Sequence, residues 1–514
     1  MATVALKSSD GKWIMVSAIL ASAMAFIDST ALNVVLPSLQ KSLNATGTDL
    51  FWLLNAYLLV LAALILIGGS LGDKLGRKKI FMFGILIFIA GSAACGFAPN
   101  VIMLIVARII QGMGGALMIP GSLSLISSSI DEKERGRAIG TWSAITTMVT
   151  IGGPVLGGAL GDAGLWRYIF FINIPIGLAA LIILALKVKE SRDTNNDEAI
   201  DFMGAIAIAL GLALLTFGFL RIPAVGMSNW QVYLSLTGGV LLLIAFLFIE
   251  ARSKHPMMPL SLFANATFSG VNLLTFFLYA GLSSGMLFLS LNLVQAQGYS
   301  QLQSGLTFLP FTALMITIAR FAGSLADKHG PRLLLIVGPA TAGAGLLILS
   351  FVKQTNGPAD YWTTFFPGIL VFGLGMSFTV APLTATVMGS VSDHFSGTAS
   401  GINNALTRIA NVFANAIFGA LAVLFFAGAL QGEIKNLPLN AKEKQSVKAE
   451  AVNLGNAKVP AGISAKDKVA IELYYHASFI HAYANIMRIS AGLGFLGALM
   501  SVVFVRNSAV KKDK

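Results

Sequence analysis

The sequence has 514 residues, of which 56% are hydrophobic and only 11% are charged, and its formal net charge is +12. Soluble domains carry roughly 25% charged residues, and a water-soluble core could not hide this much apolar surface. The basic residues lie in short links between apolar runs instead of along one face, which excludes a nucleic-acid-binding surface. The single cysteine, Cys95, lies within an apolar run, so disulfides and thiolate metal sites are excluded and no cofactor is expected.

Apolar runs of about twenty residues recur from Trp13 nearly to the end, and each is long enough to cross a bilayer as a helix. The first run follows Lys7 and Lys12 but is long and lacks a small-residue cleavage site, so we interpret it as a retained helix. The predicted fold class is therefore an all-α polytopic membrane protein. About fourteen spans are expected, at residues 13–39, 50–71, 79–97, 101–126, 137–160, 166–186, 201–221, 230–250, 268–296, 304–326, 332–352, 362–388, 398–430 and 478–505.

Links rich in lysine and arginine alternate with links that are nearly bare of them. Under the positive-inside rule the rich links are cytoplasmic, and an even number of spans places both termini there as well. The link at 431–477 falls on the outer side and carries several lysines, but long loops are exempt from the rule, and its Ala/Lys/Glu stretches are expected to form short surface helices. The rich links hold Lys74, Arg77, Lys78 and Lys79, then Lys133, Arg135 and Arg137, then Lys187, Lys189 and Arg192, then Arg252 and Lys254, then Lys328 and Arg332.

One link motif occurs twice, as GSLGDKLGRKK from Gly69 and as GSLADKHGPR from Gly323. Two copies imply two homologous halves, and transporters built this way bind their substrate near the midplane, between the repeats. If each half has six spans, the seventh and eighth of the fourteen are extra. The predicted domains are a six-helix half at 1–200, two inserted helices at 201–260, and a second six-helix half at 261–514.

The chain resembles the fourteen-span drug:proton antiporters of the major facilitator superfamily, the group of QacA-like and EmrB-like exporters. The matching runs are FIDSTALNVVLPSL, WLLNAYLL, GSLGDKLGRKK, ARIIQGMGGALMIP, GGPVLGGALGD and WRYIFFINIPIG, in this order. The resemblance implies a major facilitator fold, a small-molecule substrate, protons as the coupling ion and a place in the cell membrane. It also implies a periplasmic adaptor protein as a partner if the cell has an outer membrane.

The repeated link motif is a candidate latch for the cytoplasmic gate. Its glycines permit a tight turn and close helix approach, its aspartate can accept hydrogen bonds at a helix N-terminus, and its arginine can pair with acidic groups. In the second copy Pro331 stands at the arginine position. The alternative is that the basic residues only set the topology. The candidate latch residues are Gly69, Asp73, Gly76 and Arg77, with Gly323, Asp327 and Gly330 in the second copy.

Asp28 is the only acidic residue deep in any predicted span, and an intramembrane carboxylate is a functional hypothesis by default. Arg108 lies at a similar depth in the fourth span, so the two can pair. The resemblance gives the aspartate a proton-binding role and the arginine a coupling role. A static ion pair that braces two helices is the alternative.

Gly153, Pro154, Gly157 and Gly158 match the fifth-span motif of the antiporters, although the family often has a further glycine where this chain has Val149. Small residues four apart let helices touch, and proline bends a span. Antiport is therefore the expectation, with helix packing alone as the alternative.

Four polar residues of the thirteenth span, Asn404, Arg408, Asn411 and Asn415, recur at helical spacing and so share one face. Such a stripe would be costly against lipid, so it is expected either to line the substrate cavity or to form interhelical hydrogen bonds. Gln111 of the fourth span is a further candidate for substrate contact.

We therefore expect a proton-coupled antiporter that exports small molecules, either drugs or an amphipathic metabolite. An importer or uniporter on the same fold is the alternative. A polytopic membrane enzyme is disfavoured because four histidines lie in links and the fifth, His481, lies near an outer interface, so none builds a catalytic cluster at membrane depth. Because Asp28 alone could attract a cation, a neutral, anionic or monovalent substrate fits as well as a multivalent cationic drug.

Overall fold

The computed structural model describes residues 3–191, 201–392 and 395–506. Within these ranges every regular element is a helix, apart from one bridge between Val4 and Ile130. Fourteen helices in the described residues are long and apolar enough to cross a membrane. The predicted all-α class and the predicted number of spans are both confirmed.

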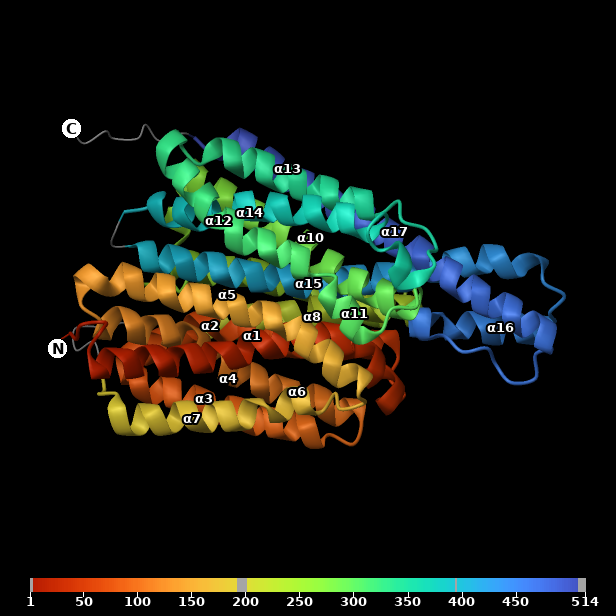
Figure 1. The fold of residues 1–514 in the computed structure, drawn as a ribbon, viewed down its shortest axis with the longest axis horizontal. Helices are drawn as coiled ribbons and strands as arrows, with labels where there is room; N and C mark the ends of the chain where they lie inside the picture. Colours follow the sequence, from red (N-terminus) through yellow and green to blue (C-terminus); the bar gives the residue numbers. More distant parts are fainter. Residues whose placement is uncertain (1–2, 192–200, 393–394, 507–514) are drawn as a thin grey trace. The chain divides into compact units, whose positions relative to one another are not determined.

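The helices of the first part of the chain follow one another through short links (Figure 1). They are α1 (Ser9–Leu43), α2 (Gly47–Leu75), α3 (Arg77–Phe97), α4 (Val101–Ser129), α5 (Glu132–Asp162), α6 (Tyr168–Phe171), α7 (Asn173–Lys187), α8 (Phe202–Val225) and α9 (Trp230–Arg252).

The second part of the chain has the same character, with additional short helical turns. Its elements are η1 (Leu260–Ala264), α10 (Ala266–Gln295), α11 (Gln301–Leu306), α12 (Leu309–His329), α13 (Arg332–Leu349), η2 (Gly357–Asp360), α14 (Phe365–Gly389), α15 (Ser396–Glu433), η4 (Ile434–Asn436), α16 (Ala441–Ala449), η5 (Glu450–Asn456) and α17 (Ala465–Phe504).

The predicted internal repeat reappears in the way two pairs of helices pack. Helices α3 and α4 lie against each other, as do α13 and α14. A Cβ on Gly114 of α4 would lie 2.4 Å from the backbone nitrogen of Phe88, and a Cβ on Gly375 of α14 would lie 2.2 Å from that of Ala342. Both crossings therefore need glycine, because only a residue without a side chain lets the two backbones approach so closely.

The chain divides into two compact units. Unit 1 comprises Met1–Ser38, Trp52–Leu215 and Thr237–Pro259, and unit 2 comprises Leu39–Phe51, Thr216–Leu236 and Leu260–Lys514. Helices α8 and α9 thus contribute to both units, each at one end. The domain limits expected from the repeat, at 200 and 260, describe homologous halves and remain a prediction.

The last helix begins earlier than predicted. Residue 478 was the expected start, whereas α17 begins at Ala465, so the outer link shortens to the segment that holds η4, α16 and η5. Ser464 caps α17 by accepting a hydrogen bond from the backbone N–H of Asp467, and this first part of the helix is polar. Hydropathy could not detect it, because these turns extend the helix beyond the apolar run. Figure 1 shows the segment in blue around α16.

Candidate functional site

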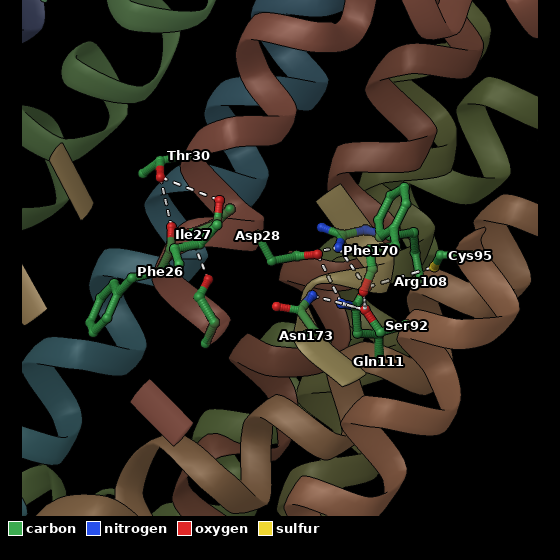
Figure 2. Close-up of polar contacts among 12 residues, drawn as sticks. Phe26, Ile27, Asp28, Thr30, Ser92, Cys95, Arg108, Gln111, Phe170 and Asn173 are labelled. Carbon is green, nitrogen blue, oxygen red and sulfur yellow. Dashed lines mark hydrogen bonds and ion pairs between the residues drawn. The ribbon is translucent and has the colours of Figure 1, made fainter. Parts of the chain in front are cut away.

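A buried polar cluster lies between helices of unit 1 (Figure 2). Asp28 comes from α1, while Arg108 and Gln111 lie one turn apart on α4 and so share one face of that helix. Asp28 and Gln111 are 0% exposed and Arg108 is 1% exposed. The structure therefore brings together the two residues expected to carry proton coupling, and it adds Gln111 to them.

These three side chains form a closed ring of hydrogen bonds. The Nη1 group of Arg108 donates to Asp28 Oδ2 and to Gln111 Oε1, the latter at 2.7 Å. Gln111 Nε2 donates to Asp28 Oδ1 at 2.8 Å. Both carboxylate oxygens of Asp28 are thus satisfied by buried donors, one of which is cationic. Such charge-assisted hydrogen bonds are shorter and stronger than bonds between neutral groups.

A second layer of contacts fixes the amide of Gln111. Its Nε2 group also lies 3.3 Å from Ser92 Oγ, and Asn173 Nδ2 donates to the same oxygen at 2.9 Å. The Ser92 hydroxyl donates to the carbonyl oxygen of Phe170 at 2.9 Å. Within the described part of the chain, Asn173 Oδ1 has no hydrogen-bond partner. Helices α3, α6 and α7 therefore all contribute to the position of the Asp28 ring.

An aromatic ring covers the guanidinium of Arg108. Its Cζ atom lies 4.3 Å from the ring centroid of Tyr57 on α2 and 6.0 Å from that of Phe170. Cation–π attraction strengthens when the cation is desolvated, so these rings offset part of the loss of water around Arg108. Sequence analysis did not assign Tyr57, Ser92 or Asn173, although Tyr57 and Asn173 lie in the matching runs WLLNAYLL and WRYIFFINIPIG.

The glycine motif of α5 packs on the segment of α1 that follows Asp28. A Cβ on Gly153 would lie 1.9 Å from Thr30 Oγ1, and one on Gly157 would lie 2.4 Å from the carbonyl oxygen of Ala31. Pro154 is half-buried and Gly158 is buried in the same helix. Any sliding of α1 relative to α5 therefore acts directly on the helix that carries the buried carboxylate.

The first link motif turns at Gly76, whose φ of 115° favours glycine. The carboxylate of Glu190 caps the following helix α3 by accepting hydrogen bonds from the backbone N–H groups of Lys78 at 3.0 Å and Lys79 at 3.1 Å. A Cβ at position 76 would lie 2.9 Å from Glu190 Cδ. The glycine is therefore needed for its conformation and for the approach of Glu190, a residue that sequence analysis did not assign.

Arg77 also contacts the segment that follows α7. Its backbone N–H donates to the carbonyl oxygen of Ser191 at 2.8 Å, and its Nη1 group lies 3.4 Å from Ser191 Oγ. The side chains of Asp73 and Asp327, which were expected to take part in the latch, lie outside the described residues. Arg77 and the backbone N–H groups of Lys78 and Lys79 therefore bond to residues 190 and 191.

The second copy of the link motif has the same backbone features. Gly330 ends α12 with a φ of 84°. Gly69 faces Pro120 of α4, with 3.9 Å from its added Cβ to Pro120 Cβ, and Gly323 faces Ala381 of α14 at 3.7 Å. The two motifs therefore occupy equivalent places against equivalent helices of their own units.

The polar residues on α15, which we call the α15 row, are Asn404, Arg408, Asn411 and Asn415. Asn404 is exposed and donates to the carbonyl oxygen of Ser400 at 3.1 Å, Arg408 and Asn411 are half-buried, and Asn415 is 4% exposed. The row therefore passes from an open to a buried position along one helix.

The buried end of the row is held by α10. Asn415 Oδ1 lies 3.4 Å from the hydroxyl of Ser283. Next to the row, Asn403 donates to Asn272 Oδ1 at 3.0 Å and to Thr275 Oγ1 at 2.7 Å, a contact that sequence analysis did not anticipate. The α10–α15 crossing thus uses Asn403 and Asn415 for interhelical hydrogen bonds, while Asn404 bonds within its own helix.

Residues 18–415 match the Major Facilitator Superfamily. The tetracenomycin C resistance and export protein of Streptomyces glaucescens is 27% identical over 484 residues, which cover 93% of this chain and 89% of that protein. The methylenomycin A resistance protein of Bacillus subtilis is 32% identical over 428 residues, which cover 82% of this chain and 90% of that protein.

A solved structure shows the same fold. The bacterial homologue of the human lysosomal transporter Spinster, in an inward-facing and unoccupied conformation, aligns with a TM-score of 0.67 at 18% identity, covering 98% of this chain and 100% of that chain. The fourteen membrane-spanning helices, the repeated link motif and these matches agree, and the chain belongs to the Major Facilitator Superfamily, whose members are transporters and not enzymes.

Proposed function

We propose that this transporter is a proton-coupled antiporter that exports small organic molecules, with Asp28 as its proton-binding group and Arg108 as the partner of that group. The observation that carries the proposal is the fully buried ring of Asp28, Arg108 and Gln111. An ionisable pair at membrane depth is expensive to keep, and such pairs mark proton relays in pumps and transporters. Relatives named for resistance to and export of antibiotics support an organic substrate.

The proposed cycle uses the charge of Asp28 as the switch. In the arrangement described here the carboxylate accepts hydrogen bonds from Arg108 and Gln111. Protonation from the outer side would remove the negative charge and weaken both contacts, so that α1 could shift against α4 and α5 and the inward-open state would become accessible. The release of the proton into the cytoplasm restores the ring. Burial and the nearby cation act on the carboxyl group in opposite directions, which makes its affinity for protons sensitive to such a shift.

We also propose that the link motif and Glu190 form the cytoplasmic latch. Glu190 holds the N-terminus of α3 through two backbone N–H groups, where the helix dipole favours a negative charge. The hydrogen bond between the backbone of Arg77 and the backbone of residue 191 ties the same turn to the segment that follows α7. These contacts would break and re-form as the cytoplasmic gate opens and closes.

Transport in proteoliposomes tests the coupling. Purified protein is reconstituted with an acidic lumen and exposed to tetracenomycin C, methylenomycin A and a panel of dyes, antibiotics and iron chelators. Antiport predicts accumulation in the lumen together with proton efflux, without ATP, and collapse when a protonophore is added. Accumulation that survives the protonophore, or that requires the opposite gradient, would contradict the proposal and favour a uniporter or a symporting importer.

We further propose that the protein lies in the cell membrane with both termini in the cytoplasm. The buried Cys95 can be replaced by alanine to give a cysteine-free background. A cysteine at Lys74 should then react with a membrane-impermeant maleimide only from the cytoplasmic side, and one at Lys448 only from outside. The reverse pattern would overturn the orientation.

A further inference from the structure

The two extra helices carry a carboxylate pair that the proposed cycle does not use. Helices α8 and α9 pack closely: a Cβ on Gly211 would lie 2.9 Å from a methyl carbon of Leu243. Asp201 directly precedes α8, and Glu250 lies in the last turn of α9, so both carboxylates stand at the same end of this helix pair. This is the end that the distribution of basic links predicts to be cytoplasmic.

Each carboxylate uses one oxygen to hold backbone. Asp201 Oδ1 accepts a hydrogen bond from the N–H of Gly204 at 2.8 Å, in the first turn of α8. Glu250 Oε2 accepts one from the N–H of Met258 at 3.0 Å, in the link that leads to η1 and α10. Glu250 is only 2% exposed although it lies two residues from the end of its helix. Both side chains therefore have fixed positions.

The remaining two oxygens lie close to the same point beside Gly204. A Cβ added to Gly204 would lie 2.9 Å from Glu250 Oε1 and 3.0 Å from Asp201 Oδ2, so one point in space is close to both atoms. Both atoms are buried, and within the described part of the chain neither has a hydrogen-bond partner. Neither oxygen therefore has a donor among the described residues, and a proton bound to one of them would make it a donor for the other.

Among the described residues no ion pair joins either carboxylate to a cation. On the chain around Glu250, the nearest cationic or titratable groups are Arg252, which is exposed and lies 3.9 Å from the ring centroid of Phe248, and Lys254 and His255 in the following link. Glu250 is buried, and Asp201 is half-buried with a buried Oδ2 atom. Neighbouring carboxylates in such a setting repel each other when both are ionised, and they can relieve this repulsion by sharing one proton.

We infer that Asp201 and Glu250 share a proton between Oδ2 and Oε1, and that the base of the α8–α9 pair is a second proton-binding site, separate from Asp28. No bond is made or broken apart from the O–H bond that the proton forms. The shared proton fastens the start of α8 to the end of α9, and through the other oxygen of Glu250 it stabilises the anchor at Met258. Loss of the proton leaves two adjacent charges and loosens that anchor. The inference does not depend on the antiport proposal.

Infrared difference spectroscopy on the purified full-length protein tests it directly. A pH titration over roughly pH 5 to 9, a range that covers buried carboxyl groups, should show the carbonyl band of a protonated carboxylic acid. The band should persist in Asp28→Asn and disappear in both Glu250→Gln and Asp201→Asn. If the band is absent from the wild type, or is lost only in Asp28→Asn, the second site does not exist.

Thermal stability gives an independent measurement. Because the shared proton stabilises the folded state, its contribution is present at low pH and is lost as pH rises, so the wild type should melt at progressively lower temperature across the titration. Glu250→Gln keeps the shape of the side chain and can donate a hydrogen bond to Asp201, so its melting temperature should depend less on pH. The exposed Glu472→Gln is the matched control and should behave like the wild type. A Glu250→Gln profile parallel to that of the wild type would refute the shared proton, whatever the transport assay shows.

Discussion

Two polar regions at membrane depth are built in opposite ways. In unit 1 the ring around Asp28 is closed, since both carboxylate oxygens are bonded to Arg108 or Gln111 and none of the three residues is more than 1% exposed. In unit 2 the α15 row is open at one end, where Asn404 is exposed, and it is buried at Asn415. The first region is a charge pair enclosed by protein, and the second is a line of amides with one cation.

This difference indicates different uses of polar groups in a transporter. A closed, fully bonded ionic ring changes only when its charge changes, so it suits a small ligand such as a proton. A half-open row of amides can adapt its hydrogen bonds to solutes of different shape, because each amide offers both donors and an acceptor. We therefore expect substitutions in the ring to affect all substrates and substitutions in the row to affect substrates selectively.

Asp28→Asn should have the largest effect. Asparagine is nearly isosteric but cannot titrate, so we expect proton release on substrate addition to be lost and export to be abolished for every substrate. The protein should remain folded and inserted, since the amide still accepts a hydrogen bond from Arg108. Proton release in proteoliposomes and the melting temperature of the purified protein measure the two effects.

The two measurements also distinguish a proton-binding role of Asp28 from a purely structural ion pair with Arg108. If Asp28 only holds Arg108, the substitution leaves a buried arginine uncompensated, which costs a few kcal/mol of stability. An unstable variant would therefore favour the static ion pair, and a folded variant that still releases protons would remove Asp28 from the mechanism.

The sequence alone was sufficient to predict the membrane spans and the pairing of Asp28 with Arg108. Hydropathy identifies fourteen spans because lipid requires long apolar runs, and Asp28 and Arg108 stand out because charges in such runs are rare. It could not select Ser92 or Asn173, because many serines and asparagines occur in membrane helices. Which of these side chains contact one another depends on how each helix is rotated and on which helices are its neighbours. Neither can be read from the local sequence of one chain.

Three acidic residues with structural roles could not be recognised from the sequence, because acidic residues are common at such positions. Glu190 lies in a charged link, where an acidic residue is normally solvated, and only the fold shows that it caps α3. Asp201 and Glu250 lie at helix ends, where acidic residues are also common, and are separated by almost fifty residues. Their approach follows from the tight packing of α8 on α9, which depends on tertiary structure.

Gly157→Ala should have the next largest effect, on stability and on transport. The added Cβ would lie 2.4 Å from the carbonyl oxygen of Ala31, so α1 and α5 must separate. Overpacking of this kind costs about 1–3 kcal/mol. Gly152→Ala is the matched control on the same helix, because nothing lies within 4 Å of its added Cβ. Melting temperatures of the two variants measure the difference, and equal values would show that α1 and α5 tolerate separation.

Asn403→Ala should have a smaller effect, confined to unit 2. The amide donates two hydrogen bonds, to Asn272 and Thr275 on α10. Interhelical hydrogen bonds in membrane proteins contribute about 0.6 kcal/mol each on average, so we expect a loss of about 1 kcal/mol with proton coupling preserved. Asn404→Ala, which removes only a bond to its own helix, is the control. A larger loss in the control would show that the exposed part of the row also holds the fold.

Arg408→Gln should have the smallest effect on stability and the most selective effect on transport. The side chain is half-buried on a row of otherwise neutral amides. Glutamine keeps hydrogen-bonding capacity but removes the charge, so the melting temperature should change little, while transport of substrates that carry a carboxylate or phenolate should fall relative to that of neutral ones. The comparison uses aromatic acids and their methyl esters in the same proteoliposomes, with Arg408→Lys as the variant that retains the charge. An equal loss of transport for acids and esters would indicate that Arg408 takes part in proton coupling together with Asp28. The proposed division between a closed ring that binds protons and an open row that contacts substrates would then be wrong for Arg408.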